Sequence, residues 1–169
     1  MKLYKTPKGK KAYFRPLQLR ERGYESPEPV AFVKYNKGLV TSVTYFVSLL
    51  SKYRYSLASI TDLSDDERHE VTDSFARFAA RLHEDGFLHR DFSSSNILFD
   101  KVGDRYRFAL VDTNSLRTGR PVSVEKGCAN FSRLIGDNEF FSELARVYAE
   151  ARKADPDYCR RLIDKAKGL

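Results

Sequence analysis

The run GFLHRDFSSSNILF, residues 86–99, places the strongest constraint on what this chain of 169 residues can be. A match to four fixed residues at set spacing arises by chance in a chain of this length only about once in a thousand. A carboxylate and a side-chain amide on one short loop can accept a proton and ligate a hard cation. The run therefore predicts a catalytic loop, whose fixed positions are His89, Arg90, Asp91 and Asn96.

A long helix is predicted directly before this loop. Ser64 and Glu67 form an S-x-x-E capping box, and the apolar residues that follow fall at helical spacing as far as Leu82. Gly86 is expected to end the helix, so that the loop follows its C-terminal end. The other two histidines of the chain, His69 and His83, are expected on the surface of this helix.

A β-hairpin is predicted directly after the loop. Residues 97–99 and 106–111 are rich in apolar and aromatic side chains, and a polar turn separates them. A hairpin brings its two ends close together. We therefore expect Asn96 at one end and Asp112 at the other to be able to share a metal ion.

The pattern H-R-D-x-x-x-x-N is that of the catalytic loop of protein kinases. The loop predicts phosphoryl transfer that depends on ATP and Mg²⁺, with Asp91 as the base that takes the proton of the acceptor hydroxyl. Asn96 and Asp112 are the expected Mg²⁺ ligands. His89 is expected to hold the loop through hydrogen bonds, and Arg90 to bind an anion or to form an ion pair. The alternative is that these are polar loop residues with capping roles.

Three segments together resemble the Kdo/heptose lipopolysaccharide kinase family of Gram-negative bacteria. They are SPEPVA at 26–31, HRDFSSSNIL at 89–98 and LVDTN at 110–114, and the resemblance extends over roughly residues 10–135. It implies a small enzyme of protein-kinase-like fold that phosphorylates sugars of the lipid A inner core with ATP. It also implies Asp91 as the base and Asn96 with Asp112 as the metal ligands.

Two positions differ from the protein kinases that act on Ser or Thr. Those enzymes usually carry Lys two positions after the catalytic Asp, where this chain has Ser93. Their D-F-G motif corresponds here to D-T-N at 112–114, which keeps the metal-binding Asp without the Phe and the Gly. Both differences favour a sugar or other small acceptor over a protein, and we do not expect a regulated activation loop.

The predicted fold class is α+β and protein-kinase-like, as one kinase-like domain. Residues 1–50 would form a reduced N-lobe of one helix, starting near Arg15 because of Pro16, and a hairpin. Residues 51–169 would form a mainly helical C-lobe that carries the catalytic loop.

No Gly-rich phosphate loop is found before residue 10, and Lys2 is the candidate for the nucleotide-binding Lys, with Lys5 as a competitor. The chain is expected to be either the later part of a longer kinase or a minimal kinase.

Charge and cysteine content indicate location and partners. Residues 1–40 hold ten Lys or Arg against three Asp or Glu, whereas the rest of the chain is balanced. Such a basic segment suits a phosphate-bearing sugar or lipopolysaccharide precursor, and peripheral contact with the anionic surface of the inner membrane. Cys128 and Cys159 fit no metal spacing, which is typical of a reducing, cytoplasmic location. Nucleic-acid binding is not expected, and the oligomeric state stays open.

Two further functions compete with a lipopolysaccharide kinase. A small-molecule phosphotransferase resembling aminoglycoside or choline kinases would share the loop pattern. A catalytically inactive pseudokinase that binds a partner would explain the missing phosphate loop, but the intact Asp91, Asn96 and Asp112 argue against it. Acceptor screening would distinguish the first alternative from a lipopolysaccharide kinase. Titration with Mg-ATP would distinguish the second, because a pseudokinase of this kind would show no detectable nucleotide binding.

Overall fold

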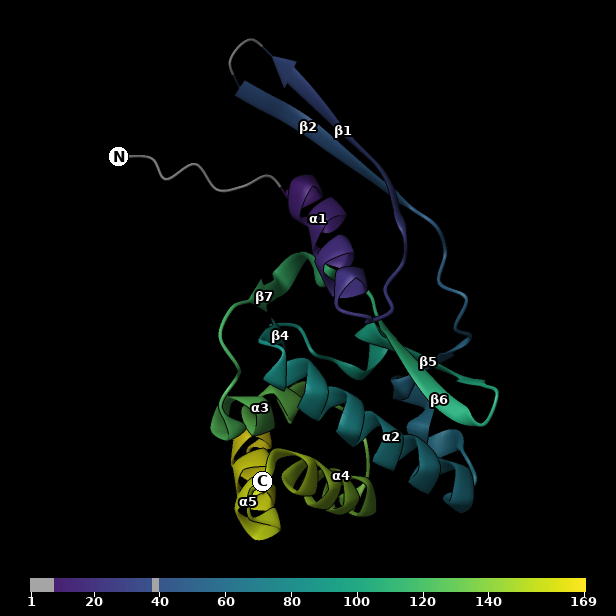
Figure 1. Cartoon of the computed structure of the whole chain (residues 1–169), viewed down its shortest axis with the longest axis vertical. Helices are drawn as coiled ribbons and strands as arrows, with labels where there is room; N and C mark the ends of the chain where they lie inside the picture. Colours follow the sequence, from purple (N-terminus) through teal and green to yellow (C-terminus); the bar gives the residue numbers. More distant parts are fainter. Residues whose placement is uncertain (1–7, 38–39) are drawn as a thin grey trace. The chain divides into compact units, whose positions relative to one another are not determined.

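The computed structural model of the protein describes residues 8–37 and 40–169 (Figure 1). The chain divides into two compact units. The first comprises Met1–Lys52 and Ala109–Asn114, and the second comprises Tyr53–Phe108 and Ser115–Leu169. Lys2, the candidate nucleotide-binding residue, and its competitor Lys5 lie outside the described residues.

The first unit contains a helix and a β-hairpin, as the sequence predicts. Helix α1 spans Lys8–Glu21, and the antiparallel strands β1 and β2 span Pro29–Lys37 and Val40–Ser48. Their register places Phe32 opposite Phe46. Helix α1 packs against both strands, as Figure 1 shows.

The predicted start of this helix near Arg15 is wrong, because α1 continues through Pro16 from Lys8. Proline within a helix costs roughly 3 kcal/mol, since it removes one backbone hydrogen bond and its ring crowds the preceding turn. Here Pro16 is buried, and Leu19 one turn later is fully buried. Packing of this apolar side of the helix therefore offsets the local cost of the proline.

A short segment from much later in the chain completes the first unit. The backbone N–H of Leu110 donates to the carbonyl of Glu25 at 3.0 Å, and the Ser26 hydroxyl donates to the carbonyl of Leu110 at 2.7 Å. Ser26 is buried, and a buried hydroxyl needs a hydrogen-bond partner, which the carbonyl of Leu110 supplies. Asp112 follows two residues later and consequently belongs to the first unit.

The second unit is mainly helical and carries two small sheets. One sheet has the strand order β3-β5-β6, and in the other β4 pairs antiparallel with β7. The predicted hairpin after the catalytic loop is confirmed as β5 and β6. In chain order after β2, the elements are β3 (Tyr55–Ser56), η1 (Leu57–Asp62), α2 (Asp65–Glu84), β4 (Phe87–His89), η2 (Ser94–Asn96), β5 (Ile97–Val102), β6 (Arg105–Leu110), η3 (Thr113–Ser115), β7 (Leu116–Thr118), α3 (Val124–Asn130), η4 (Phe131–Arg133), α4 (Asn138–Arg152) and α5 (Pro156–Lys167). The end of β6 and most of η3 fall in the segment Ala109–Asn114 of the first unit.

Aromatic side chains form the centre of the second unit. Phe75 of α2 is fully buried, and its ring centroid lies 6.0 Å from that of Phe92 and 5.6 Å from that of Phe108. The ring of Phe131 in η4 lies 6.4 Å from that of Phe75. Such ring pairs add to the free energy of burial. The cluster thereby joins the long helix, the catalytic loop and the later helices.

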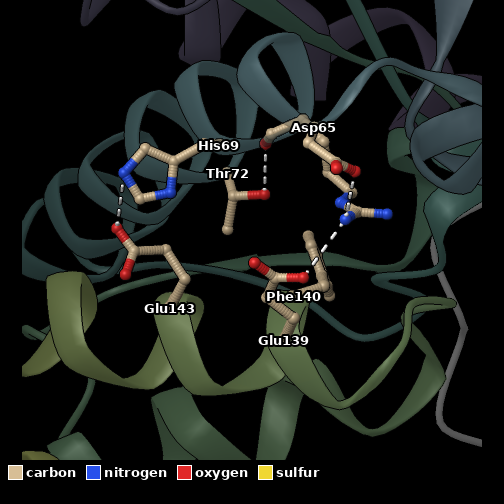
Figure 2. A pocket seen from close by; sticks show the side chains of 7 residues that line it. Asp65, His69, Thr72, Glu139, Phe140 and Glu143 are labelled. Carbon is tan, nitrogen blue, oxygen red and sulfur yellow. Dashed lines mark hydrogen bonds and ion pairs between the residues drawn. The ribbon is translucent and has the colours of Figure 1, made fainter.

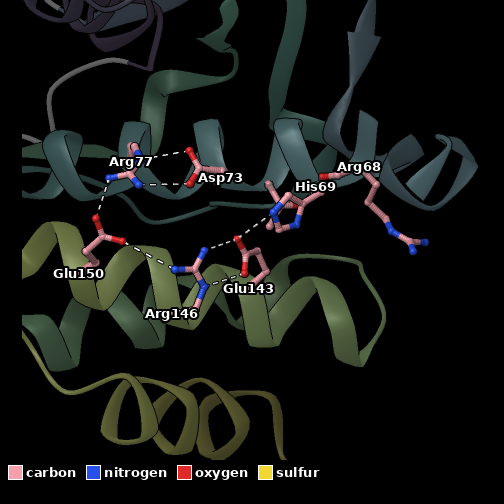
Figure 3. A network of polar contacts seen from close by, with 8 residues as sticks. Arg68, His69, Asp73, Arg77, Glu143, Arg146 and Glu150 are labelled. Atoms are coloured by element: carbon pink, nitrogen blue, oxygen red, sulfur yellow. Dashed lines mark hydrogen bonds and ion pairs between the residues drawn. The ribbon is translucent and has the colours of Figure 1, made fainter. Parts of the chain in front are cut away.

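Ion pairs connect α2 to α4 on the surface of the second unit (Figure 3). Arg77 bridges Asp73 of its own helix at 3.0 Å and Glu150 of α4 at 3.5 Å. Exposed pairs of this kind contribute little individually. The remaining pairs drawn in Figure 3 are Arg146 with Glu150, Arg146 with Glu143, and His69 with Glu143.

Candidate functional site

Helix α2 leads into the catalytic loop through a sharp turn. The hydroxyl of Ser64 accepts from the backbone N–H of Glu67, which confirms Ser64 as the N-cap of α2, and it donates to the Glu67 carboxylate. At the other end Gly86 has a φ of 79°, and a Cβ there would lie 2.1 Å from the carbonyl oxygen of Gly119. Only glycine tolerates this conformation together with this close approach. The chain then turns directly into β4, whose last residue is His89.

His89 is fully buried and holds the start of the loop. Its Nδ1 accepts a hydrogen bond from the backbone N–H of Asp91 at 3.2 Å. Its carbonyl oxygen accepts from the side-chain amide of Asn130 at 2.9 Å. The adjacent Arg90 is instead exposed to solvent. The structure thus places His89 in the hydrogen bonding of the loop, whereas any catalytic role of Arg90 stays a prediction.

Asp91 presents its carboxylate at a half-buried position. Its side chain is 37% exposed, and Oδ1 lies 2.5 Å from a guanidinium nitrogen of Arg133. Its carbonyl oxygen accepts from Nδ2 of Asn96 at 3.0 Å, which closes the loop across five residues. The intervening Phe92 is buried in the aromatic cluster. Asp91 is therefore held on both sides while its carboxylate remains accessible.

The amide of Asn96 is oriented by the same hydrogen bond. Because Nδ2 donates to Asp91, Oδ1 is the atom of this amide that can ligate a cation. Amide and carboxylate oxygens are the ligands that Mg²⁺ takes from proteins. The chemistry of Asn96 consequently fits the predicted metal ligand.

Asp112 occupies an unusual backbone conformation in the first unit. Its φ is 46°, in the left-handed region that residues other than glycine adopt uncommonly. Its Oδ1 accepts from Nδ2 of Asn114 at 2.9 Å. Oδ1 of Asn114 is buried and has no hydrogen-bond partner among the described residues. An unpaired buried acceptor is unfavourable, and a cation bound at Asp112 would be one way to compensate it. Joint coordination with Asn96, in the second unit, stays a prediction.

Residues 130–135, which we call the corner segment, form a part of the site that the sequence does not predict. Besides the bond from Asn130 to the loop, the backbone N–H of Ile135 donates to the hydroxyl of the buried Ser94 at 2.8 Å. Arg133 lies between these two contacts and pairs with Asp91, although 42 positions separate them. No local pattern marks Arg133, because its neighbours show only the spacing of a short helical turn.

A buried polar network supports the corner segment from α2 and α4. His83 is fully buried, so the expected surface position of His83 is wrong. Its Nδ1 lies 2.9 Å from the hydroxyl of Tyr148, and its Nε2 lies 3.2 Å from Oδ1 of Asn130. Arg152 donates to the same hydroxyl at 2.8 Å. Tyr148 is thus left to donate to Nδ1, and the Nε2–H of neutral His83 donates to Asn130.

This environment strongly disfavours the charged form of His83. Burial is the largest cause, and it lowers the pKa of His83 to about 4, while the hydrogen bond to Asn130 opposes the change. The positive charge of Arg152 lowers the pKa further. His83 is therefore neutral near pH 7, and the network from Arg152 to the catalytic loop is fully hydrogen-bonded.

One pocket lies away from the catalytic loop, between α2 and α4, and is lined mainly by charged and polar side chains (Figure 2). Arg68 on its wall pairs with Asp65 at 2.9 Å and with Glu139 at 3.2 Å, and His69 lies 3.6 Å from Glu143. Its lining includes no residue of the catalytic loop, and its charges are already paired. We therefore place the candidate site at the loop and not in this pocket.

Residues 8–37 and 40–169 contain no group of three or more His, Cys, Asp or Glu side chains arranged to hold a metal ion. Among the described helices, none is both long and apolar enough to cross a membrane.

Comparison with known protein families gives a match over most of the chain. The family model "Lipopolysaccharide kinase (Kdo/WaaP) family" matches residues 16–135. No curated protein sequence matches the chain.

Solved structures show the fold. The structure of WaaP in complex with acyl carrier protein superposes with a TM-score of 0.67 at 17% identity, covering 95% of this chain and 76% of that chain. A crystal structure of WbdD superposes with a TM-score of 0.52 at 17% identity, covering 100% of this chain and 40% of that chain. The α+β, protein-kinase-like fold is therefore confirmed.

Proposed function

Because the chain belongs to the lipopolysaccharide kinase (Kdo/WaaP) family, we propose that it transfers a phosphoryl group from ATP to a Kdo or heptose hydroxyl of the lipopolysaccharide inner core. Membership makes it a kinase, a phosphotransferase with an alcohol group as acceptor. The observation that carries the assignment of residues is the catalytic loop. The amide of Asn96 holds the backbone carbonyl of Asp91, and the accessible Asp91 carboxylate is in contact with the guanidinium of Arg133.

Asp91 is the base in this proposal. The oxygen of the acceptor hydroxyl attacks the γ-phosphorus, its proton passes to the Asp91 carboxylate, and the bond between the γ-phosphorus and the bridging oxygen breaks to release ADP. Phosphoryl transfer has a loose transition state, so the protein contributes mainly alignment of the hydroxyl and stabilisation of charge. His89 acts on this step by fixing the backbone of Asp91.

Asn96 and Asp112 would hold Mg²⁺, which neutralises phosphate oxygens when it is bound. The orientation of the Asn96 amide and the unpaired Oδ1 of Asn114 beside Asp112 support this assignment. We further propose residues 1–50 as a reduced N-lobe and 51–169 as the C-lobe, with Lys2 at the nucleotide. The basic segment at residues 1–40 suits work at the cytoplasmic face of the inner membrane.

The test is transfer of label from ATP to core lipopolysaccharide. Asp91→Asn keeps the size of the side chain and removes the base, so kcat should fall by roughly 10²- to 10⁴-fold. Asp104→Asn, in the exposed turn between β5 and β6, is the matched control and should retain activity. Circular dichroism should show that both variants fold. Equal label transfer by wild type and Asp91→Asn would exclude Asp91 as the base.

A further inference from the structure

Arg133 faces the proposed base from outside the predicted motif. Its side chain is 61% exposed, and its guanidinium lies 2.5 Å from Oδ1 of Asp91. A guanidinium presents several N–H donors in a planar fork that matches a carboxylate or a phosphate. A single short contact to Asp91 leaves other donors of this fork for a second anion.

The backbone around Arg133 is fixed to the catalytic loop. On one side Asn130 donates to the carbonyl oxygen of His89, and on the other side the N–H of Ile135 donates to the hydroxyl of Ser94. Phe131, two positions before Arg133, and Leu134, directly after it, are both buried. The base of the Arg133 side chain is therefore held rigidly, whereas its exposed end can exchange partners.

The contact with Arg133 also has a consequence for the base. While the guanidinium occupies Oδ1, one of the two oxygens that could accept the hydroxyl proton is engaged. Ion pairs between exposed side chains contribute little to stability, so an incoming anion can take the guanidinium at small cost. An acceptor with a negative group beside its reactive hydroxyl would do this and place the hydroxyl next to Asp91.

We propose that Arg133 is the anion-binding residue of the acceptor site: it binds a carboxylate or phosphate group next to the hydroxyl that is phosphorylated, and thereby releases Asp91. This inference rests on the proposed function and adds the chemistry by which the acceptor is recognised. Arg133 touches the acceptor and positions it, whereas Asp91 takes the proton. The two residues should consequently affect different measured quantities.

Binding tests the inference without requiring phosphoryl transfer. Delipidated core oligosaccharide is titrated calorimetrically into wild type, Arg133→Gln and the control Arg161→Gln, whose exposed guanidinium lies on α5. We expect Arg133→Gln to weaken binding by roughly 10- to 100-fold, as expected for loss of a charge-assisted contact. Arg161→Gln should bind like wild type, and Arg133→Lys should recover part of the affinity.

Modified oligosaccharides identify the anion. One arm uses core oligosaccharide with methyl-esterified carboxylates, and the other uses core treated with phosphatase. The modification that removes the relevant anion should weaken binding to wild type and have no further effect on Arg133→Gln. Unchanged affinity of Arg133→Gln, no binding by wild type, or equal losses in wild type and Arg133→Gln for both modifications would overturn the inference.

The label-transfer assay separates this inference from the proposed function. If wild type binds the oligosaccharide through Arg133 but transfers no label, the proposed function fails and the anion site stands. If wild type transfers label and Arg133→Gln does so with an unchanged KM for the acceptor, the anion site is wrong and the kinase assignment stands. Asp91→Asn should instead lower kcat without raising the acceptor KM.

Discussion

Lowering the pH from 7 to 5 should destabilise the protein through one buried side chain, His83. The unfolded chain binds a proton at the ordinary His pKa of about 6.5, whereas burial holds the pKa of His83 at about 4 in the folded protein. The unfolded state consequently binds more protons between these values, and the free energy of unfolding falls as the pH is lowered. The contribution of neutral, buried His83 to the free energy of unfolding is fully present above about pH 6.5 and is lost as the pH falls toward 4.

The size of the effect follows from the same two pKa values. The full difference corresponds to roughly 3.4 kcal/mol once the pH lies below both of them, and about 2 kcal/mol of it is already lost at pH 5. In the neutral form of His83, Tyr148 and Asn130 satisfy both ring nitrogens. A second proton on the ring would instead face the hydroxyl of Tyr148, to which Arg152 already donates.

Urea unfolding at pH 7 and pH 5, followed by circular dichroism, measures this contribution. His83→Gln is the comparison, because its amide can still meet both partners but does not titrate. Between pH 7 and pH 5 the wild type should lose about 2 kcal/mol more than the variant, since all other titrating groups are common to both. Equal losses in the two proteins would refute the reasoning from burial.

Three substitutions in the second unit test its packing and capping, each by the free energy of unfolding in urea. Phe75→Ala removes the centre of the aromatic cluster and should cost about 3–5 kcal/mol; a loss below about 1 kcal/mol would show that the ring is not part of a close-packed core. Gly127→Ala would place a Cβ 1.9 Å from the hydroxyl of Tyr148 and should cost about 1–3 kcal/mol, whereas Gly119→Ala, which has open space around it, is the control and should be nearly neutral. Ser64→Ala removes the N-cap of α2 and should cost about 1 kcal/mol; an unchanged midpoint would mean that the cap does not contribute.

The sequence by itself determined the elements and motifs that depend on nearby residues. The N-cap of α2 joins Ser64 and Glu67, three positions apart, and the structure has Ser64 bonded to both the backbone N–H and the carboxylate of Glu67. The hairpin after the loop follows from two runs rich in apolar and aromatic side chains with a polar turn between them. The catalytic loop closes between Asp91 and Asn96, five positions apart, so its pattern can be read from the sequence directly. These contacts span few residues, and side-chain chemistry and spacing therefore predict them.

Only the tertiary structure decided which distant residues meet. Arg133 reaches Asp91 across 42 positions, and Asn130 reaches His89 across 41. His83 resembles a surface residue at its place in the helical pattern. Its burial depends on Tyr148, 65 positions away, whose hydroxyl forms a hydrogen bond with Nδ1 of His83. Burial of a polar side chain depends on partners that the local sequence does not contain. The continuation of α1 through Pro16 is a further case, because the helix packs against β1 and β2, and the local sequence does not contain these contacts.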